Sequence, residues 1–449
     1  MGKHYVVVGA GFRGFCDTLQ LLSKPGNKVT IIDTAPFFGG ISYSADIKGF
    51  AVDKGVHMFD SIPQELADTV SEIMDGKVRK IDFVSMSAYN NVITDGFSLP
   101  DLSSLDDLTK ERITQELKAL AAQGGAKREP KTLAEYLEDR YGKTAGGIFA
   151  GIFKEIYNIS ADKAQPDAIS KTSLGRLKYL DDEQMLALKA SDPWLDNVLA
   201  ARRKAVGKVD DLVSVYPDSG EAMRGWCTRA AKWLEAKGAT ICLGENITAI
   251  TQTATGVEIQ TDKQRIEADK VIWTNDNIKA LAGILGFEFD LSSYISGTPM
   301  IFATLMTHAK HIKDFTYMQN FGPGGKTYRT ASAGIYSNQI TPEGISFITS
   351  ECPTDMASER WEKADEAHGE IWQECKALGI IHEDAELTGH HILRLPSTFK
   401  VAKLGYDEKV AEFSEEVAKR NERVVFRSVK PFFRRDIFLD APKVLELAA

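Results

Sequence analysis

Three glycines near the start of the chain have the type and spacing needed to bind a phosphate group. Gly9, Gly11 and Gly14 fit the pattern G-x-G-x-x-G, between an apolar run at residues 4–8 and an apolar segment typical of a helix. Gly9 permits a tight turn, Gly11 lets backbone N–H groups approach a pyrophosphate, and Gly14 lets the helix lie close to the strand. The first N–H groups of such a helix are unpaired and lie at its positive end, so the spacing predicts a dinucleotide-binding turn.

A second apolar segment supplies the rest of this local unit. Residues 28–32 predict a strand that ends at Asp33, an acidic residue placed to accept hydrogen bonds from a ribose 2′-hydroxyl. Strand, helix, strand and acid in register form the βαβ unit that the glycine pattern requires. We therefore expect an α/β chain with a Rossmann-like domain.

The residues after Asp33 carry a resemblance to a flavoprotein superfamily. A short loop leads from Asp33 to Gly39 and Gly40, and residues 40–59 contain the pattern D-x-G-x-H, which ends at His57. Together they resemble the glutathione-reductase-type flavoproteins, in the branch that holds FAD-dependent amine oxidases, protoporphyrinogen oxidases, phytoene desaturases and UDP-galactopyranose mutases. The resemblance implies FAD as the cofactor.

The glycine pattern and the resemblance together assign a set of residues to the cofactor. In the resemblance, backbone groups at Ile247 meet the adenine and Thr274 lies near the pyrophosphate. The expected cofactor residues are Gly9, Gly11, Phe12, Arg13, Gly14, Asp33, Thr34, Gly39, Gly40, Ile41, Ser42, Gly55, Val56, His57, Ile247, Thr274, Arg427 and Asp436.

The resemblance also implies a discontinuous organisation, with a Rossmann-like FAD-binding domain, a helical insertion and a mixed-sheet α+β substrate domain. Residues 1–60, 210–285 and 406–449 are expected to form the FAD-binding domain. Residues 61–209 are expected to be mostly helical and to carry part of the substrate cavity, and residues 286–405 to hold the substrate-binding mixed sheet. Within that last range, the segments TYRTASAGIYSNQ and GISFITSECP predict strands.

Composition limits the partners and the compartment. The 449 residues are enough for two sizeable cores, and the formal net charge of −9 without a basic tail predicts no nucleic-acid partner. Five scattered cysteines without a C-x-x-C pair argue against a disulfide framework, so we expect a cytoplasmic protein without a signal peptide. No apolar run reaches the roughly 18 residues that span a bilayer. We expect a small-molecule substrate, anionic or a nucleotide sugar, and a homodimer is one expectation.

Three residues are candidates for catalysis. In the resemblance, His57 lies near the edge of the isoalloxazine, where it would bind the flavin, assist proton transfer or orient substrate. The alternative is a histidine satisfied by backbone in a buried turn. Tyr328 and Arg329 resemble a cavity-facing strand of the mutase-like members, and Arg329 would clamp a carboxylate or phosphate. The alternative there is a surface arginine. His308 and His311 lack a third ligand, so no metal site is expected.

The last segment of the chain resembles the closing motif of the mutase-like members but departs from it. Phe426 and Val429 replace two glycines of that motif. Arg427 could still pair with a phosphate, and Asp436 could accept from ribityl hydroxyls, with Asp440 as the alternative. Arg434 and Arg435, with Lys430, could contact a phosphate or form a solvated turn.

Three functions follow from these expectations. The first is an FAD-dependent oxidoreductase, similar to amine oxidases and protoporphyrinogen oxidases, that moves hydride from a small molecule to flavin N5. The second is a mutase-like flavoenzyme that isomerises a nucleotide sugar with reduced FAD. The third is an FAD-binding scaffold without turnover, suggested by the replaced glycines.

Overall fold

The glycine-rich turn lies inside the βαβ unit that the sequence predicts. Strand β1 (His4–Val8) leads into helix α1 (Phe12–Leu22), which returns to the parallel strand β2 (Lys28–Asp33). Val6 and Val7 are fully buried, as expected for a parallel strand covered on both faces. The computed structural model describes residues 2–82, 84–90, 92–202, 212–427, 430 and 433–448.

Contacts divide the chain into two units, and each is described by itself. Unit 1 comprises Met1–Asp82, Asp210–Leu291 and Asp407–Ala449, and unit 2 comprises Phe83–Val209 and Ser292–Tyr406. Unit 1 continues past residue 60 because two strands there, β5 and β6, pair with strand β9 of the same unit.

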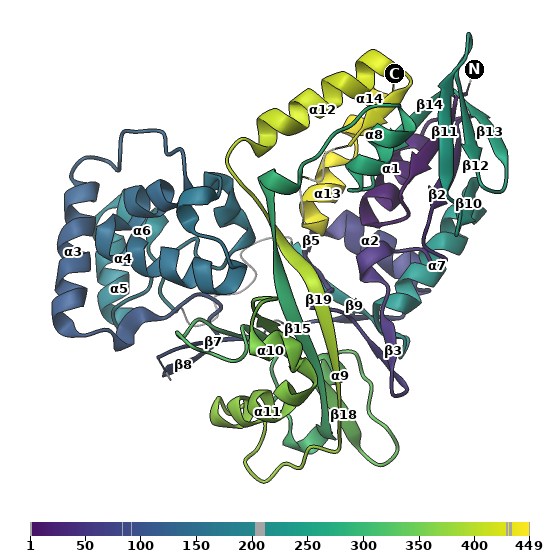
Figure 1. Ribbon diagram of the computed structural model, residues 1–449. Helices are drawn as coiled ribbons and strands as arrows, with labels where there is room; N and C mark the ends of the chain where they lie inside the picture. Colours follow the sequence, from purple (N-terminus) through teal and green to yellow (C-terminus); the bar gives the residue numbers. More distant parts are fainter. Residues whose placement is uncertain are drawn as a thin grey trace. The chain divides into compact units, whose positions relative to one another are not determined.

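The centre of unit 1 is a parallel sheet. Its strand order is β10-β2-β1-β14-β20, and every pairing in it is parallel. The three strands not yet introduced are β10 (Ala239–Leu243), β14 (Lys270–Trp273) and β20 (Val424–Phe426). Figure 1 shows α1 and β2 close together beside the strands that complete this sheet. The order places strands from all three segments of unit 1 in one sheet, with β1 at its centre.

Smaller sheets and helices complete unit 1. A hairpin follows the Gly39-Gly40 pair, and two three-stranded sheets have the orders β5-β9-β6 and β11-β12-β13. The strands are β3 (Ala45–Ile47), β4 (Phe50–Val52), β5 (Phe59–Pro63), β6 (Val78–Lys80), β9 (Leu212–Pro217), β11 (Ile247–Gln252), β12 (Val257–Thr261) and β13 (Arg265–Ala268). The helices are α2 (Gln64–Ile73), α7 (Ala222–Ala236), α8 (Ile278–Ile284), α12 (Tyr406–Arg420), α13 (Arg434–Asp440) and α14 (Lys443–Leu447).

Unit 2 contains a mixed sheet of seven strands. The order is β19-β15-β18-β17-β16-β7-β8, with β16 parallel to β7 and the other pairs antiparallel. The strands are β7 (Ser85–Tyr89), β8 (Val92–Asp95), β15 (Ile295–His308), β16 (Tyr317–Asn320), β17 (Arg329–Ala331), β18 (Ile345–Pro353) and β19 (Gly389–Ala402). The long strands β15 and β19 run side by side in Figure 1. The predicted fold class, a Rossmann-like domain with helices and a mixed sheet, is confirmed.

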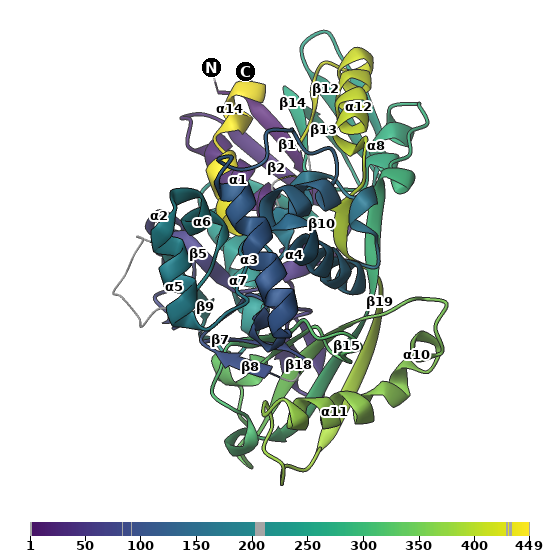
Figure 2. The ribbon, with the colours of Figure 1, turned by 90° about the vertical axis from the view of Figure 1, so that its left-hand side faces the viewer.

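Helices form the rest of unit 2. They are α3 (Asp107–Ala121), α4 (Leu133–Tyr157), α5 (Asp182–Ser191), α6 (Pro193–Val198), α9 (Ala333–Tyr336), α10 (Glu359–Glu362) and α11 (His368–Ala377). Figure 2 shows α3, α4, α5 and α6 grouped together, as they also are in Figure 1. Leu137 and Tyr141 of α4 are fully buried, as are Phe149 and Phe153, because four-residue spacing places the members of each pair on one side of the helix. Between the two pairs, Gly142 has a non-helical φ of 81°, which kinks α4. The segment TYRTASAGIYSNQ, predicted as strand, holds strand β17 but also helix α9, so that expectation was right only in part.

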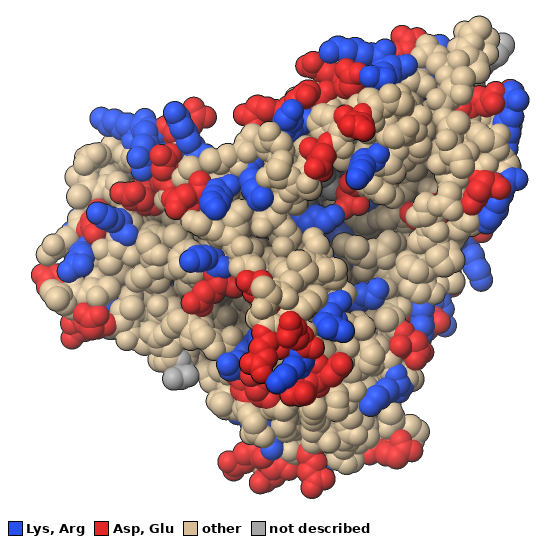
Figure 3. All heavy atoms as spheres, viewed as in Figure 1, with Lys and Arg blue, Asp and Glu red and all other residues tan. Residues whose placement is uncertain are grey.

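The surface carries charges of both signs. On the face in Figure 3, lysine and arginine side chains are interspersed with acidic ones, including a mixed group over α10. Ion pairs such as Lys363–Glu359 link residues of this group. None of the helices in the described part of the chain has the length and apolar character needed to cross a membrane.

Candidate dinucleotide-binding site

Two of the three fingerprint glycines are required by the packing of the chain itself. Gly9 has a φ of 115°, in the left-handed region, and a Cβ there would lie 2.6 Å from Thr274 Oγ1. A Cβ on Gly14 would lie 1.9 Å from the carbonyl oxygen of Gly9. Thr274 holds the turn from the neighbouring strand, since its hydroxyl donates to the Val8 carbonyl at 2.9 Å. The turn is therefore closed tightly against β14.

Gly11 differs from the other two glycines. A Cβ built on Gly11 meets no atom of the described residues within 4 Å. Gly11 is also the N-cap of α1, and because it has no side chain it cannot cap the first N–H groups of the helix. Neither chain packing nor helix capping therefore explains a glycine here, whereas a pyrophosphate approaching the helix N-terminus does. The residues present fit a dinucleotide.

Asp33 lies beside the same turn. Its Oδ2 accepts a hydrogen bond from the Ala10 N–H at 2.7 Å, and its Oδ1 accepts from the Ala35 N–H at 2.8 Å. A carboxylate has about four acceptor positions, so these two bonds orient Asp33 and leave capacity for ribose hydroxyls. The neighbouring Thr34 is exposed.

The glycine pair after Asp33 is held against the turn. The Gly39 N–H donates to the Ala10 carbonyl at 2.8 Å, and a Cβ on Gly39 would lie 2.2 Å from Cys227 Sγ. A Cβ on Gly40 would lie 3.4 Å from Gly11 Cα. The structure therefore brings Gly40 beside Gly11, although the two are far apart in sequence. The next residue, Ile41, is 81% exposed, whereas Ser42 is buried.

The D-x-G-x-H segment lies between β4 and β5 and is anchored by its aspartate. The buried Asp53 carboxylate accepts hydrogen bonds from the hydroxyls of Ser44 and Tyr216, both at 2.5 Å. Burial raises the pKa of Asp53 to about 6, and the hydrogen bonds from Ser44 and Tyr216 oppose this rise. Gly55 adopts a φ of 128° in this segment, and His57 is half-buried. Val56 is also half-buried.

Sequence reasoning did not single out Asp53 as an anchor. Its position in the D-x-G-x-H pattern was visible, but its partner Tyr216 lies 163 residues away in β9. A buried aspartate in an otherwise apolar strand end is the signal that could have found it, because such a group requires hydrogen-bond partners.

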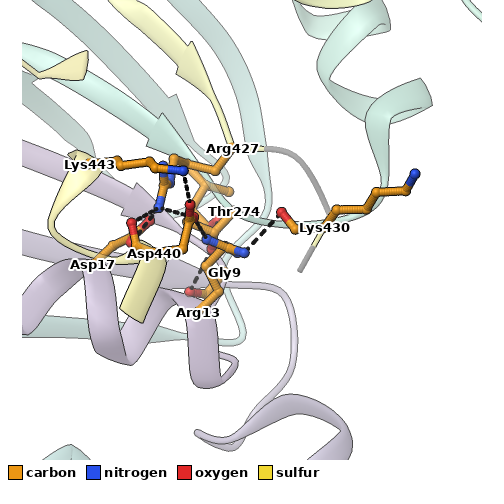
Figure 4. A network of polar contacts seen from close by, with 9 residues as sticks. Gly9, Arg13, Asp17, Thr274, Arg427, Lys430, Asp440 and Lys443 are labelled. Carbon is orange, nitrogen blue, oxygen red and sulfur yellow. Dashed lines mark hydrogen bonds and ion pairs between the residues drawn. The ribbon is translucent and has the colours of Figure 1, made fainter. Parts of the chain in front are cut away.

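The closing segment forms a buried ion network, shown in Figure 4. Arg427 Nε donates to Asp17 Oδ2 at 3.1 Å, and Arg427 Nη2 donates to Asp440 Oδ2 at 2.9 Å. The same Asp440 oxygen accepts from Arg13 Nη1 at 2.9 Å, and Lys443 Nζ lies 2.9 Å from Asp440 Oδ1. Arg427, expected to meet a phosphate, thus binds two carboxylates in this structure.

The other expected positions in the closing segment lie apart from this network. Asp436 pairs with Arg435 Nε at 3.0 Å, and Asp440 is the aspartate that joins the network. The ring of Phe426 packs edge-on against Phe413 of α12, with centroids 5.0 Å apart. Val429, the second replaced glycine, lies outside the described residues.

Asp17, which the sequence analysis did not consider, is the innermost member of the network. Its side chain is completely buried, and burial raises its pKa to about 6 although Arg427 and Arg13 lower it. Asp17 lies on α1 and Arg427 lies 410 residues later. The network therefore ties the end of the chain to the helix that carries the fingerprint.

Ile247 belongs to unit 1, and the two remaining catalytic candidates belong to unit 2. Ile247 begins β11, opposite Thr261 in the sheet β11-β12-β13 of unit 1. Tyr328 is buried in unit 2, where its hydroxyl accepts from Gln319 Nε2 at 2.7 Å. Burial raises the pKa of Tyr328.

Arg329 of unit 2 is bound by a carboxylate from the neighbouring strand. Its Nε and Nη2 donate to the two Glu351 oxygens, both at 2.8 Å, in a bidentate pair. Glu351 is buried, and burial raises its pKa although Arg329 lowers it. The clamp expected for a substrate anion is used here to hold two strands of the sheet.

The described residues contain no group of three His, Cys, Asp or Glu side chains that could hold a metal ion. All five cysteines are free thiols, and burial raises the pKa of Cys16 and of Cys227.

Comparison with known proteins agrees with this geometry. Residues 7–73 match the family of NAD(P)-binding Rossmann-like domains. This segment forms part of a Rossmann-like domain. It holds the last two residues of β1, the whole of α1 and β2, the Gly39-Gly40 pair and the D-x-G-x-H segment, that is, most of the candidate site. A search of curated proteins with the whole sequence returned no match.

Solved structures of the same fold cover the whole chain. A reduced UDP-galactopyranose mutase has a TM-score of 0.75 at 15% identity, over 99% of this chain and 95% of that one. Putrescine oxidase bound to putrescine has a TM-score of 0.62 at 14% identity, over 100% and 98%. A fatty acid isomerase from P. acnes has a TM-score of 0.60 at 14% identity, over 99% and 98%. The chain shares the fold of these proteins, and that fold carries both oxidation and isomerisation.

Proposed function

We propose that unit 1 binds FAD and that the protein is an FAD-dependent oxidoreductase acting on a small molecule. The observation that carries the proposal is the N-terminus of α1, where Gly11 leaves room that no described residue fills. The match to Rossmann-like domains and the fold shared with putrescine oxidase support it. The resemblance of the D-x-G-x-H segment is the reason for choosing FAD over other dinucleotides.

Each part of the site has a task in this proposal. The first N–H groups of α1 bind the pyrophosphate, and Asp33 accepts from a ribose hydroxyl. Gly40 lies beside Gly11 and keeps this approach free of side chains. His57 holds or transfers a proton beside the flavin. FAD, when bound, accepts a hydride from a substrate C–H bond and passes the electrons to an acceptor.

The second candidate function is the isomerisation of a nucleotide sugar. The observation that favours it is the fold shared with the reduced UDP-galactopyranose mutase at a TM-score of 0.75. Against it, Arg329, the residue expected to clamp an anion, is bound at Nε and Nη2 by the two oxygens of Glu351. An anion could displace Glu351 only by leaving a buried carboxylate without its partner, which is costly.

The visible absorbance spectrum of the purified protein, before and after anaerobic dithionite, tests the cofactor. Flavin bands that bleach on reduction support the proposal, and a colourless protein that takes up no added FAD overturns it. Gly11→Trp should abolish flavin binding by filling the approach to α1. Gly151→Trp is the matched control, because Gly151 is exposed on α4 and also has no neighbour within 4 Å among the described residues.

Product analysis then separates the two functions. An oxidoreductase consumes an electron acceptor in proportion to product, whereas the isomerase requires flavin reduced beforehand and consumes none. Turnover of a nucleotide sugar without an acceptor would replace the first proposal by the second.

A further inference from the structure

Arg434, the first residue of α13, extends into the region of the fingerprint. Its Nη2 donates to Ser42 Oγ at 2.8 Å, and its Nη1 donates to the Met58 carbonyl at 3.0 Å. The guanidinium carbon lies 5.1 Å from the ring centre of Phe59 and 5.7 Å from that of Phe12. Phe12 is the first residue of α1, and Ser42 ends the turn that begins at Gly40.

Among the described residues, this guanidinium forms no hydrogen bond or ion pair with a carboxylate, and the nearby Asp53 attracts it only through the longer-range effect of its charge. Its hydrogen-bond acceptors are a hydroxyl and a carbonyl, and its Nε is buried without any hydrogen-bond partner there. Burial lowers the pKa of Arg434. Arg13 and Arg427 of the same unit differ, because both form ion pairs with Asp440. A partly buried cation without a hydrogen-bonded counterion is costly, and a ligand of opposite charge would offset that cost.

The position of Arg434 indicates which anion it takes. Ser42 and Phe12 adjoin Gly40 and Gly11, the two glycines whose Cα atoms approach each other at the start of α1. We propose that Arg434 binds the pyrophosphate of the dinucleotide through the fork of N–H groups at the end of its guanidinium. A guanidinium suits this task because two parallel N–H groups match two phosphate oxygens. The proposal rests on the proposed function, because it takes FAD as the ligand.

The direct test compares the FAD affinity of the full-length wild-type protein with that of Arg434→Gln, by titration calorimetry. We expect affinity to fall about 10- to 100-fold, the effect of losing charge-assisted hydrogen bonds. The matched control is Arg435→Gln on the same helix, whose side chain is 42% exposed and pairs with Asp436. Its FAD affinity should equal that of the wild type.

Two simpler probes separate the phosphates from the rest of the ligand. ADP carries a diphosphate and adenosine carries none, so Arg434→Gln should lower the affinity for ADP and leave the affinity for adenosine unchanged. Equal weakening of both would indicate a general structural role for Arg434 and overturn the inference. If Arg434→Gln does not fold, Arg434→Lys, which keeps the charge and loses the fork, gives the same comparison with a smaller expected loss.

The outcomes distinguish this inference from the proposed function. Tight FAD binding that is equal in the wild type and Arg434→Gln overturns the inference and leaves the cofactor proposal intact. If the wild type binds no FAD, the cofactor proposal fails, and ADP binding alone then tests the inference about Arg434. ADP binding that depends on Arg434 then supports an anion site, and ADP binding that is absent or independent of Arg434 overturns it.

Discussion

Arg329 in unit 2 and Arg434 in unit 1 are both arginines that lie near aromatic rings, but among the described residues only Arg329 is hydrogen-bonded to a carboxylate. The Arg329 guanidinium lies 5.6 Å from the ring centre of Phe399 and binds both oxygens of Glu351. Arg434 lies near the rings of Phe59 and Phe12, and its hydrogen bonds go only to neutral acceptors among the described residues. The residue type is therefore a poor guide to an anion site, and the partner within the fold is a better one.

The largest expected effect on stability comes from removing the carboxylate that pairs with Arg329 in unit 2. Glu351→Gln leaves the buried Arg329 charge without its partner, and we expect the free energy of unfolding to fall by about 3–5 kcal/mol. Urea denaturation measures the loss. Glu359→Gln, which removes an exposed partner of Lys363, is the control and should change stability by less than about 0.5 kcal/mol. Equal losses in the two variants would contradict the assignment of a structural pair.

Arg427→Gln should have the next largest effect, about 2–4 kcal/mol, because it leaves Asp17 buried without its nearest cation. The effect should depend on pH. The pKa of Asp17 is raised in the folded protein from 3.8 to about 6, so its contribution to stability falls as pH rises through this range. Without Arg427 that pKa rises further, and the loss continues to higher pH. Denaturation at about pH 5 and about pH 8 should show the larger loss at pH 8, and a pH-independent loss would contradict this account.

Arg434→Gln should change the stability of the protein without cofactor much less than Arg427→Gln does. Two hydrogen bonds to neutral acceptors are lost, each contributing about 1 kcal/mol, and removal of an unpaired buried charge offsets them. We expect a net change of about 1 kcal/mol or less by urea denaturation. A loss as large as that of Arg427→Gln would show that Arg434 is structural.

Arg435→Gln should have the smallest effect. Its partner Asp436 is 35% exposed, and exposed pairs contribute about 0–1 kcal/mol. In thermal unfolding, this variant should have the same midpoint temperature as the wild type. A clear loss of stability would contradict the expectation that the exposed Arg435–Asp436 pair contributes little to the free energy of unfolding.

The sequence predicted well where the deciding contacts are local. The strands and the helix around the fingerprint were found because apolar periodicity and glycine spacing act within about forty residues. The strand predicted over residues 327–339 forms only in part, as β17, since a short helix forms at residues 333–336 beside β18, and local propensity does not encode that packing.

The sequence was weakest on the partners of charged residues. Arg329 finds Glu351 at a separation of 22 residues, and Arg427 finds Asp17 at a separation of 410. Both arginines were expected to bind ligand anions, and the fold gives each a carboxylate. For Arg434 the sequence left two alternatives open, a phosphate contact and a solvated turn, and the surroundings of the side chain favour the first.

By itself, the sequence determined that this chain begins with a dinucleotide-binding βαβ unit, because a glycine pattern, two apolar strands and an acid are properties of neighbouring residues. The tertiary structure decided which glycine leaves room for a ligand and which arginine, among the described residues, has no hydrogen-bonded carboxylate. Those questions depend on atoms brought together from distant segments, where burial makes a charge costly unless a partner of opposite sign is near. Only folding brings Asp17 and Asp440 to Arg427, whereas Arg434 meets only neutral hydrogen-bond acceptors among the described residues.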